Sequence, residues 1–480
     1  MARSFLLLIL GLAGTACVKA QTCDCKTALT YTIGKVEKNY AGFKDKVNEK
    51  TRSHYQKFTD STLRLASTPV YQRQDSCYNL IGRWTGYMKD GHLSISIAAN
   101  VIGVDSVRRY FSSWPSVKHT EASFTNYLQR KKSLPLEGVW KNEEGNYRVG
   151  IIHLNGKYKA FVLKADSVFW MPGQIKFEFS PAGKEHRGTF YLHDHRAEAV
   201  ALYVNLQDGT IDMGKRGKWY RMDLRGNVIS PTYNARPSVV SFQQLSPSTN
   251  LITIRSFDER HRRAIDSVVK ANDQLIRSTD NLIIDVRGNG GGSDFSYYSL
   301  RNYLFTHVYQ RYTTELLCTE DNIAKSEALA KDPNFTEQER EGFRQRVEVL
   351  RQHLGKFWSA RTEPTFPSES MEVLSNPKKI GVIINGACGS TTEQFLIDVA
   401  RNSSKTTIYG EPSAGVLDYA NMWYFVIPGT PFRINYATSR SKRIDHGLGI
   451  DNVGVIPAVR LDNKVSDWVG FVQKDLEWKQ

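Results

Sequence analysis

The sequence predicts an α/β protein that carries a helical N-terminal region and an inserted all-β domain. Three observations predict this organisation: helically spaced apolar residues before residue 67, short β-rich segments between 134 and 224, and alternating strands and helices after residue 238. A length of 480 residues exceeds what one core usually organises, so we expect two or three domains. With 40% hydrophobic and 24% charged residues, the composition is that of a folded globular protein.

The formal charge is +15 and the isoelectric point is near 9.3. Lys and Arg are spread along the chain, without a basic arm and without the interleaved aromatic residues of single-strand nucleic-acid binders. We interpret the charge as a solvated basic surface and expect no nucleic-acid partner.

Residues 1–20 have the pattern of a secretory signal peptide. Arg3 precedes an apolar run over residues 5–16, and the small residues Val18 and Ala20 stand at the cleavage-site positions. The run is shorter than the ~20 residues that a transmembrane helix needs, and no later segment is long and apolar enough. We therefore expect an exported protein, periplasmic or extracellular.

The sequence has six cysteines, of which Cys17 lies in the predicted signal peptide. The others are Cys23, Cys25, Cys77, Cys318 and Cys388. An odd number in an oxidising compartment leaves at least one thiol free, and either Cys23 or Cys25 is expected to pair with Cys77. The Cys-x-Cys pair lacks the His partners of a zinc site, so no metal is expected there.

Residues 21–100 are predicted to form the helical N-terminal region. From Cys25 to about Ser67 the apolar residues recur at helical spacing, which indicates two or three amphipathic helices. A further helical stretch begins at Tyr78 and leads into Asp90-Gly-His92, after which the apolar residues alternate. His92 is therefore predicted to lie where a helix gives way to a strand.

Residues 134–230 are predicted to form the inserted β domain. Their segments are short, rich in aromatic and β-branched residues, and separated by turn signals such as Asn155-Gly156 and Asp208-Gly209. This pattern predicts a β-barrel or a β-sandwich.

Residues 238–480 are predicted to form the α/β domain. Buried strands are expected at 281–286 and 380–385, helices at 261–278 and 391–401, and a glycine-rich loop at 288–292. A charged helical insertion at about 321–354 interrupts this domain.

Ser390 lies between the strand that ends at Asn385 and the helix that follows. A Ser at such a turn presents its hydroxyl over a helix N-terminus, where backbone N–H groups favour a developing negative charge. The alternative is structural, because Ser390 could cap this helix, with Glu393 completing a capping box.

The glycine-rich loop reads Asp285-Val-Arg-Gly-Asn-Gly-Gly-Gly292. Glycines after a buried strand let the backbone approach a ligand and leave N–H groups free to donate. A dinucleotide motif is excluded because Ser293 takes the place of its last glycine, and no Gly-Lys-Ser/Thr phosphate loop is present. An oxyanion-binding loop fits better.

These segments together resemble the catalytic core of the C-terminal-processing, or tail-specific, protease family. The resemblance rests on five motifs in order, over roughly residues 75–100 and 238–462. They are Asp90-Gly-His92, Asp285–Gly292, Asn385–Glu393, Ile408–Gly415 and Gly449–Pro457. The resemblance implies a ClpP/crotonase-like catalytic core and the activity of a serine peptidase with Ser390 as nucleophile.

The resemblance also indicates how the nucleophile is activated. Many members use a Ser–Lys dyad, but the position of that Lys holds Val416 here, and Lys405 lies on the wrong side of the motif. The chain is more similar to the tricorn-core branch, which implies His92 as general base and Asp451 as the acid that orients or polarises the site.

The chemistry is coherent, since a Ser hydroxyl needs an adjacent base and a His can take and return its proton. A carboxylate on the other ring nitrogen would fix the tautomer. N–H groups of Gly290 or Gly291 and of Thr391 would stabilise the oxyanion, and the sequence leaves the choice between the glycines open.

Other candidates have structural interpretations. His193 and His195 share a face without a third metal ligand, so no metal or cofactor is expected. Cys388 is interpreted as a small buried residue. His446 is the alternative base.

The resulting hypothesis is an exported endopeptidase that acts on polypeptides. The β domain shows no carboxylate-binding loop of a PDZ domain, so recognition of C-terminal tails stays open. Two alternatives remain: a non-catalytic binding protein, because retinoid-carrying proteins of the eye use the same fold, and an esterase or amidase with the same machinery.

Overall fold

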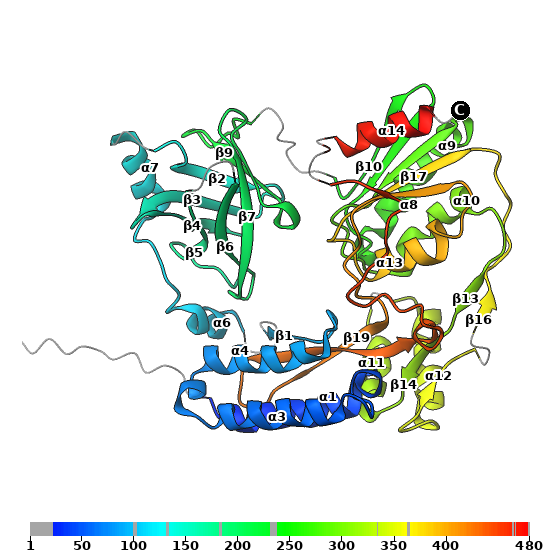
Figure 1. The fold of residues 1–480 in the computed structure, drawn as a ribbon, viewed down its shortest axis with the longest axis horizontal. Coiled ribbons are helices and arrows are strands. Elements are labelled where there is room, and N and C mark those ends of the chain that lie inside the picture. The colour runs from blue at the N-terminus through cyan, green and yellow to red at the C-terminus, as the bar shows by residue number, and fades with distance from the viewer. Residues whose placement is uncertain are drawn as a thin grey trace, which may run out of the picture.

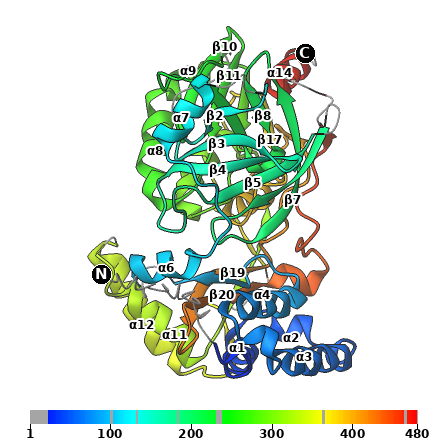
Figure 2. The same ribbon diagram turned by 90° about the vertical axis from the view of Figure 1, so that its left-hand side faces the viewer.

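The computed structural model describes residues 23–98, 103–130, 134–181, 185–230, 238–333, 335–361, 365–462, 465 and 467–478. The predicted signal peptide, residues 1–20, lies outside these residues. Figure 1 shows an eight-stranded barrel, an α/β core beside it, and a platform of helices and strands below both. The view in Figure 2 places the barrel in front of the core, again with the platform underneath.

The α/β core contains a six-stranded sheet in the order β10-β11-β12-β17-β18-β21. Its strands are β10 (Val240–Ser246), β11 (Thr249–Ile254), β12 (Asn281–Asp285), β17 (Lys379–Ile384), β18 (Thr406–Gly410) and β21 (Val459–Arg460). All neighbours from β11 to β21 are parallel, and only β10 runs antiparallel. The loops after β12, β17 and β18 therefore leave the sheet at the same edge, where ligands of open α/β sheets bind.

Helices cover both faces of this sheet, which explains why β12 is buried at every position. The helix α14 (Trp468–Trp478) packs on one face through Val472 and Leu476. The other face is covered by α8 (Arg262–Ala271), α9 (Asp273–Ser278), η5 (Asp294–Leu300), α10 (Arg301–Leu304), α13 (Thr391–Phe395) and η6 (Leu396–Ala400).

The predicted helix at 261–278 is broken into α8 and α9. Asn272 lies at the break, where its side chain donates to the carbonyl of Val268 at 2.8 Å. An Asn side chain that bonds the backbone in this way competes with the helix.

The platform joins the N-terminal helices to strands from the second half of the chain in one hydrophobic core. Its sheet contains β1 (Ser94–Ile97), β14 (Thr314–Leu317), β15 (Phe357–Trp358), β19 (Tyr419–Val426) and β20 (Phe432–Ser441). The N-terminal helices α1 (Cys25–Asn39), α2 (Phe43–Lys46), α3 (Arg52–Ala66) and α4 (Gln74–Thr85) pack against it. Trp84 of α4 and Tyr436 of β20 belong to the same buried cluster. The N-terminal region is thus completed by strands of the C-terminal domain.

The insertion forms two helices beside β14, α11 (Glu320–Leu329) and α12 (Glu337–Arg351) (Figure 1). Asp321 ties α11 to α1, because its carboxylate pairs with Lys35 at 2.7 Å. Thr336 and Glu339 form the capping box that starts α12. The insertion is therefore anchored to the platform.

The β domain is a closed barrel, since β9 pairs back onto β2. Its strands are β2 (Gly138–Asn142), β3 (Tyr147–Leu154), β4 (Lys157–Ala165), β5 (Ile175–Ser180), β6 (Glu185–Tyr191), β7 (Ala197–Asn205), β8 (Thr210–Asp212) and β9 (Lys218–Met222). Trp140, Phe177 and Trp219 fill its interior, as expected for eight strands.

The remaining elements connect these bodies. They are η1 (Pro69–Gln72), η2 (Gly86–Met88), α6 (Val104–Phe111), α7 (Glu121–Arg130), η3 (Gly214–Arg216), η4 (Glu259–His261), β13 (Gln310–Tyr312), β16 (Thr365–Pro367) and η7 (Lys442–His446). Within the described ranges, no helix combines the length and apolarity that crossing a bilayer requires.

A disulfide joins Cys25 to Cys77 and so staples α1 to α4. This is one of the two pairings that the sequence allowed. The thiol of Cys23 is buried and lies 3.7 Å from the sulfur of Cys77. Cys23 could therefore replace Cys25 as the partner of Cys77. A test of the bridge must for this reason change Cys77 rather than Cys25.

We predict that Cys77→Ser lowers the free energy of unfolding by ~4 kcal/mol, the value that chain entropy gives for a closed loop spanning 52 residues. Cys77 is the position to change because both possible bridges, from Cys25 and from Cys23, need its sulfur. Chemical denaturation measures the effect, and Cys23→Ala should leave the midpoint nearly unchanged. Equal midpoints for Cys77→Ser and the wild type would contradict the stabilising role.

Lys176 gives the barrel a pH-dependent stability. Its ammonium lies inside the barrel over the rings of Trp170, Phe190 and Tyr147, and burial lowers its pKa from 10.5 to about 7. Between these two values the unfolded chain binds a proton that the native protein does not hold, so the free energy of unfolding should rise with pH.

We predict that Lys176→Met removes this rise and stabilises the protein at and below pH 7, where the native barrel must hold the charge. Urea denaturation at several pH values across the window measures it. The matched control is Lys164→Met, at an exposed lysine, and in this variant the free energy of unfolding should still rise with pH.

Candidate active site

Ser390 occupies the turn between β17 and α13. Its backbone has φ 54° and ψ −120°, a region that a residue with a side chain adopts only under strain. The residue is half-buried. A strained Ser between a strand and a helix is the arrangement in which many hydrolases expose their nucleophile.

The carboxylate of Glu393 holds this turn in place. It accepts the N–H of Ser390 at 3.1 Å, which forms the predicted capping box. It also accepts the N–H groups of Gly415 at 2.6 Å and Val416 at 2.9 Å, and the hydroxyl of Ser413 at 2.6 Å. Glu393 is fully buried, so these four donors replace the water that it loses. The sequence indicated the cap but not the link to the loop after β18.

The glycine-rich loop after β12 lies directly against Ser390. An added Cβ at Gly291 would lie 2.9 Å from the Cβ of Ser390 and 2.7 Å from the carbonyl oxygen of Gly389. With φ +106°, Gly291 also has a backbone that other residues rarely adopt. The close approach of this loop to Ser390 therefore requires glycine.

Three hydrogen bonds join the glycine-rich loop to the turn that carries Ser390, which we call the nucleophile turn. The carbonyl of Asn289 accepts the N–H of Gly389 at 3.2 Å and the hydroxyl of Thr392 at 2.8 Å. The carbonyl of Gly292 accepts the hydroxyl of Thr391 at 2.9 Å. The two loops thus form one unit.

The N–H groups of this unit differ in what they bind. The N–H of Gly291 donates to the side-chain oxygen of Asn289 at 3.0 Å. In the part of the chain that the structure describes, the N–H groups of Gly290 and Thr391 have no protein acceptor. Of the two predicted glycines, the geometry therefore favours Gly290 as an oxyanion donor.

His92 lies in the turn between η2 and β1, at the predicted change from helix to strand. Its Nδ1 lies 2.6 Å from the carbonyl oxygen of Tyr419, and its backbone N–H donates to Asp90 at 2.8 Å. A carbonyl can only accept, so Nδ1 carries the proton and Nε2 is the ring nitrogen left free to accept one.

Val416 lies between the segments that carry His92 and Ser390. A Cβ on Gly91 would lie 2.6 Å from one methyl group of Val416, and a Cβ on Gly389 would lie 3.1 Å from the other. The residues that precede His92 and Ser390 in the sequence thus both approach the side chain of Val416. Over the described residues, no hydrogen bond joins the His92 ring to the Ser390 hydroxyl.

The predicted acid, Asp451, does not hold the imidazole. Its carboxylate accepts from the ammonium of Lys46 at 3.1 Å and from the N–H of Asp418 at 3.2 Å. Burial, reinforced by the nearby charge of Asp90, raises the pKa of Asp451 to about 7. The expected carboxylate at the second ring nitrogen is replaced by the Tyr419 carbonyl, because the Asp451 oxygens are already engaged.

The Tyr419 carbonyl was missed by sequence reasoning, and no sequence signal could have shown it, because every residue carries a carbonyl. Asp451 contacts the neighbours of Tyr419. It accepts the N–H of Asp418, which precedes Tyr419, and it pairs with Lys46, whose ammonium lies 5.0 Å from the Tyr419 ring. Asp451 is therefore placed to position the support of His92.

Other candidate bases and nucleophiles are remote in the sheet, exposed or buried. Lys405 precedes β18 and is thus at the amino end of the parallel strands, opposite the turn of Ser390. His446 is exposed and packs on Tyr312. Burial raises the pKa of Cys388 to about 12, and its sulfur lies 3.1 Å from the Val286 carbonyl.

The His193–His195 segment connects the barrel to the platform. His195 is stacked between Phe111 and Trp170, and burial lowers its pKa to about 3. Asp194 accepts the hydroxyl of Tyr78 at 2.5 Å. The residues that the structure covers contain no group of His, Cys, Asp and Glu that could hold a metal.

Residues 248–461 match peptidase family S41. No curated protein matches the sequence.

Several solved structures are similar at low identity. The structure of mature CPAF complexed with lactacystin is 12% identical, with a TM-score of 0.49 over 95% of this chain and 98% of that one. The photosystem II D1 C-terminal processing protease is 12% identical, with a TM-score of 0.40 over 92% and 94%. The tricorn protease is 11% identical, with a TM-score of 0.38 over 95% of this chain and 36% of that one.

The two adjacent glycines offer a matched pair of substitutions. We predict that Gly291→Ala slows fluorophosphonate labelling of Ser390 by about 10²-fold, because the new methyl group pushes the nucleophile turn out of place. Gly290→Ala should label at nearly the wild-type rate, since no atom lies within 4 Å of its added Cβ and its N–H remains. Equal rates for the two variants would contradict the contact.

Proposed function

We propose that the chain is a serine peptidase of the S41 type, which cleaves exported polypeptides through an acyl-enzyme on Ser390, with His92 as general base. The observation that carries the proposal is the contact between Ser390 and the glycine loop, beside which the N–H groups of Gly290 and Thr391 have no acceptor among the described residues. This is the combination that acyl transfer requires, a reachable nucleophile beside a preformed anion site.

The proposed reaction proceeds in two halves. Nε2 of His92 accepts the Ser390 proton as Oγ attacks the peptide carbonyl, and the same ring then protonates the leaving amine. Water repeats the sequence on the acyl-enzyme and releases the new carboxylate. The N–H groups of Gly290 and Thr391 bind the oxyanion, and loss of one such donor typically costs ~10²–10³-fold in rate.

A His base is supported by the surroundings of Ser390. Val416 stands where a Ser–Lys peptidase would place its lysine, and it fills the space between Gly91 and Gly389. The carbonyl of Tyr419 gives His92 the tautomer that a base needs. Asp451 acts as a positioning residue, through Asp418 and Lys46.

The barrel bears on how substrates are recognised. Each of its strands pairs with two neighbours, so it offers no free edge to an added peptide strand, which is how PDZ domains hold C-terminal tails. We therefore assign the protein the role of an endopeptidase whose barrel does not capture tails in that manner. The catalytic domain is proposed to be of the ClpP/crotonase-like type.

Export is the proposed route of this protein. The signal-peptide pattern at 1–20 supports it, and so does the Cys25–Cys77 disulfide, because such bonds persist in oxidising compartments. A periplasmic or extracellular location follows.

We predict that Ser390→Ala and His92→Ala each lower fluorophosphonate labelling and casein cleavage by at least ~10³-fold, because the nucleophile or its activation is lost. The variant His446→Ala should retain activity, since that exposed ring does not contact the site. Gel fluorescence and peptide release measure the two activities, and thermal melts should stay close to that of the wild type.

Each contrary outcome would point to a different error. Activity that survives in His92→Ala would place the base elsewhere. If the folded wild type neither reacts with the fluorophosphonate nor cleaves casein, the protein is a non-catalytic binding protein. Labelling with cleavage of small esters but not of casein would mean an esterase.

A further inference from the structure

The strand β19 lies at an edge of the platform sheet. It pairs with β20 on one side, and no described strand pairs with its other side. Such an edge presents N–H and C=O groups that a further chain can bind, and proteins usually protect it with charged residues or proline. The eight residues of β19, Tyr-Ala-Asn-Met-Trp-Tyr-Phe-Val, include neither. We call this unpaired side the β19 edge.

The backbone direction of Ile427, just after β19, identifies the groups on this edge. Its N–H donates to the carbonyl of Phe432 in β20 at 2.9 Å. In an antiparallel pair, successive residues turn their backbone groups alternately toward the partner strand and away from it. Counted back from Ile427, the residues that turn away from β20 are Val426, Tyr424 and Met422.

The other end of this stretch gives the same direction. Met422 lies opposite Ala437, whose carbonyl accepts the N–H of Ala41 at 3.0 Å rather than one from β19. Over the described residues, no hydrogen bond involves the backbone groups of Met422, Tyr424 or Val426. None of the three residues is buried, and Tyr424 is exposed. The edge thus has free backbone groups at the surface.

The same edge begins at the candidate base. Asp418, just before β19, accepts an N–H of β20 at 2.9 Å, so the next residue, Tyr419, turns away from β20. The carbonyl of Tyr419 is the one that lies 2.6 Å from Nδ1 of His92. Asn421, with φ 58°, interrupts the alternation between Tyr419 and Met422. A chain paired with Met422 is therefore about 10 Å along the strand from the carbonyl that supports His92.

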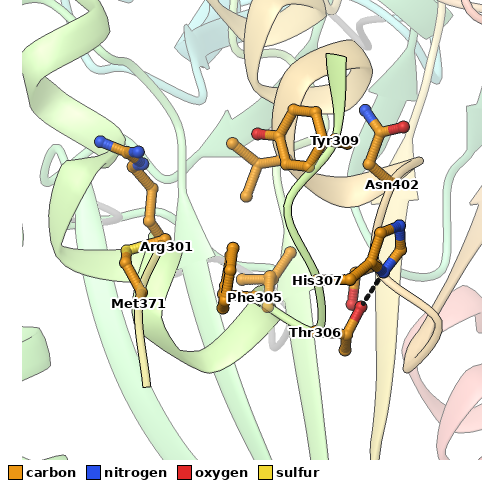
Figure 3. Close-up of a pocket in the computed structure, with 10 residues that line it drawn as sticks. Arg301, Phe305, Thr306, His307, Tyr309, Met371 and Asn402 are labelled. Carbon is orange, nitrogen blue, oxygen red and sulfur yellow. Dashed lines mark hydrogen bonds between the residues drawn. The ribbon is translucent and has the colours of Figure 1, made fainter. Parts of the chain in front are cut away.

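Neither of two pockets in the structure selects a ligand in this way. The pocket in Figure 3, which Arg301, His307 and Asn402 help to line, has a volume of about 10 Å³, enough for one water molecule at most. A larger pocket of about 300 Å³ beside α1 and β14 is lined by two lysines and two glutamates, so its charges favour neither sign. The β19 edge differs from both, because unpaired backbone groups in a strand specify another backbone as their partner.

The partner must have free backbone groups of its own. In a folded domain nearly all of these groups are already paired, whereas an unfolded or extended segment offers them along its length. Strand addition binds peptides through the main chain, and side-chain pockets add preference for sequence. The β19 edge therefore distinguishes polypeptides by conformation before sequence.

We propose that the β19 edge binds the substrate as an added β-strand, so that the peptidase acts on unfolded or extended segments and not on folded domains. This inference rests on the proposed function, because it takes the substrate to be a polypeptide that is cleaved at Ser390. The binding itself is tested without catalysis.

Binding is measured by fluorescence anisotropy on the Ser390→Ala protein. The probe is fluorescein-labelled α-lactalbumin, once in its native form and once unfolded by reduction and carboxamidomethylation. The two forms have the same sequence, and carboxamidomethylation adds no charge. We expect the unfolded form to bind at least about tenfold more tightly than the native form.

Residue-resolved hydrogen exchange identifies where the probe binds. The unfolded probe should slow amide exchange at alternate residues of β19 by at least about fivefold, because the residues between them already bond β20. The slowed amides should be those of Met422, Tyr424 and Val426. The amides of Trp423 and Phe425 should not change.

The sheet of the α/β core supplies an internal control. Its outer strand β10 pairs only with β11 among the described strands. Arg255 of the chain after β11 donates to the carbonyl of Val239, so the alternation turns the N–H of Phe242 away from β11. Exchange at Phe242 should stay unchanged, since β10 lies at the far side of the sheet from β17 and Ser390.

A matched pair of variants separates the backbone from the side chain. Tyr424→Pro removes the N–H at the edge but no bond to β20, so it should weaken binding of the unfolded probe about fivefold. Tyr424→Ala loses the ring and keeps the N–H, so it should weaken binding less. Thermal melts check that both variants fold, and the exchange pattern in Ser390→Ala tests the proposal without them.

The outcomes separate this proposal from the proposed function. Equal affinity for the two forms of the probe, or no binding of either, overturns the substrate class. Slower exchange at all residues of β19 alike, or at Phe242 as well, overturns strand addition at this edge, and so does an equal loss in Tyr424→Ala and Tyr424→Pro. If the alternate pattern is present but the wild type does not react with the fluorophosphonate, the proposed function is overturned and the strand addition stands.

Discussion

The buried carboxylate of Glu393 accepts hydrogen bonds from the nucleophile turn and from the loop that follows β18. A charge removed from water is costly unless donors replace its hydration, and here the backbone of Ser390, Gly415 and Val416 and the hydroxyl of Ser413 do so. The strained backbone of Ser390 persists because these bonds fix it. Val416 in turn receives its position from Glu393, and Val416 separates the segments of Ser390 and His92.

The parallel sheet explains why three distant loops can meet. The strands β12, β17 and β18 are neighbours and run in one direction, so the glycine loop, the Ser390 turn and the loop at 411–418 leave the sheet at one edge. The platform then brings His92 to that edge. Its N-terminal helices share a core with β19 and β20, and Tyr419, the first residue of β19, supplies the carbonyl for the imidazole.

The barrel and the insertion serve a different purpose in the fold. Aromatic side chains fill the barrel, which makes it a solid body joined to the platform at Asp194 and His195. The insertion is tied to α1 by Asp321. Both elements are thus fixed to the platform rather than to the turn of Ser390.

The sequence by itself determined the features that depend on neighbours along the chain. Examples are the buried strand before the glycine loop, the Ser390–Glu393 cap, the helix-to-strand change at His92 and the turn at Asn155-Gly156, where both residues have positive φ. Only the tertiary structure decided which backbone groups find partners and which segments meet: the bond from the Gly291 N–H to Asn289, the Tyr419 carbonyl at His92, and the pairing of Asp451 with Lys46. The reason is physical, because backbone N–H and C=O groups are the same in every residue, and their partners are set by packing rather than by residue type.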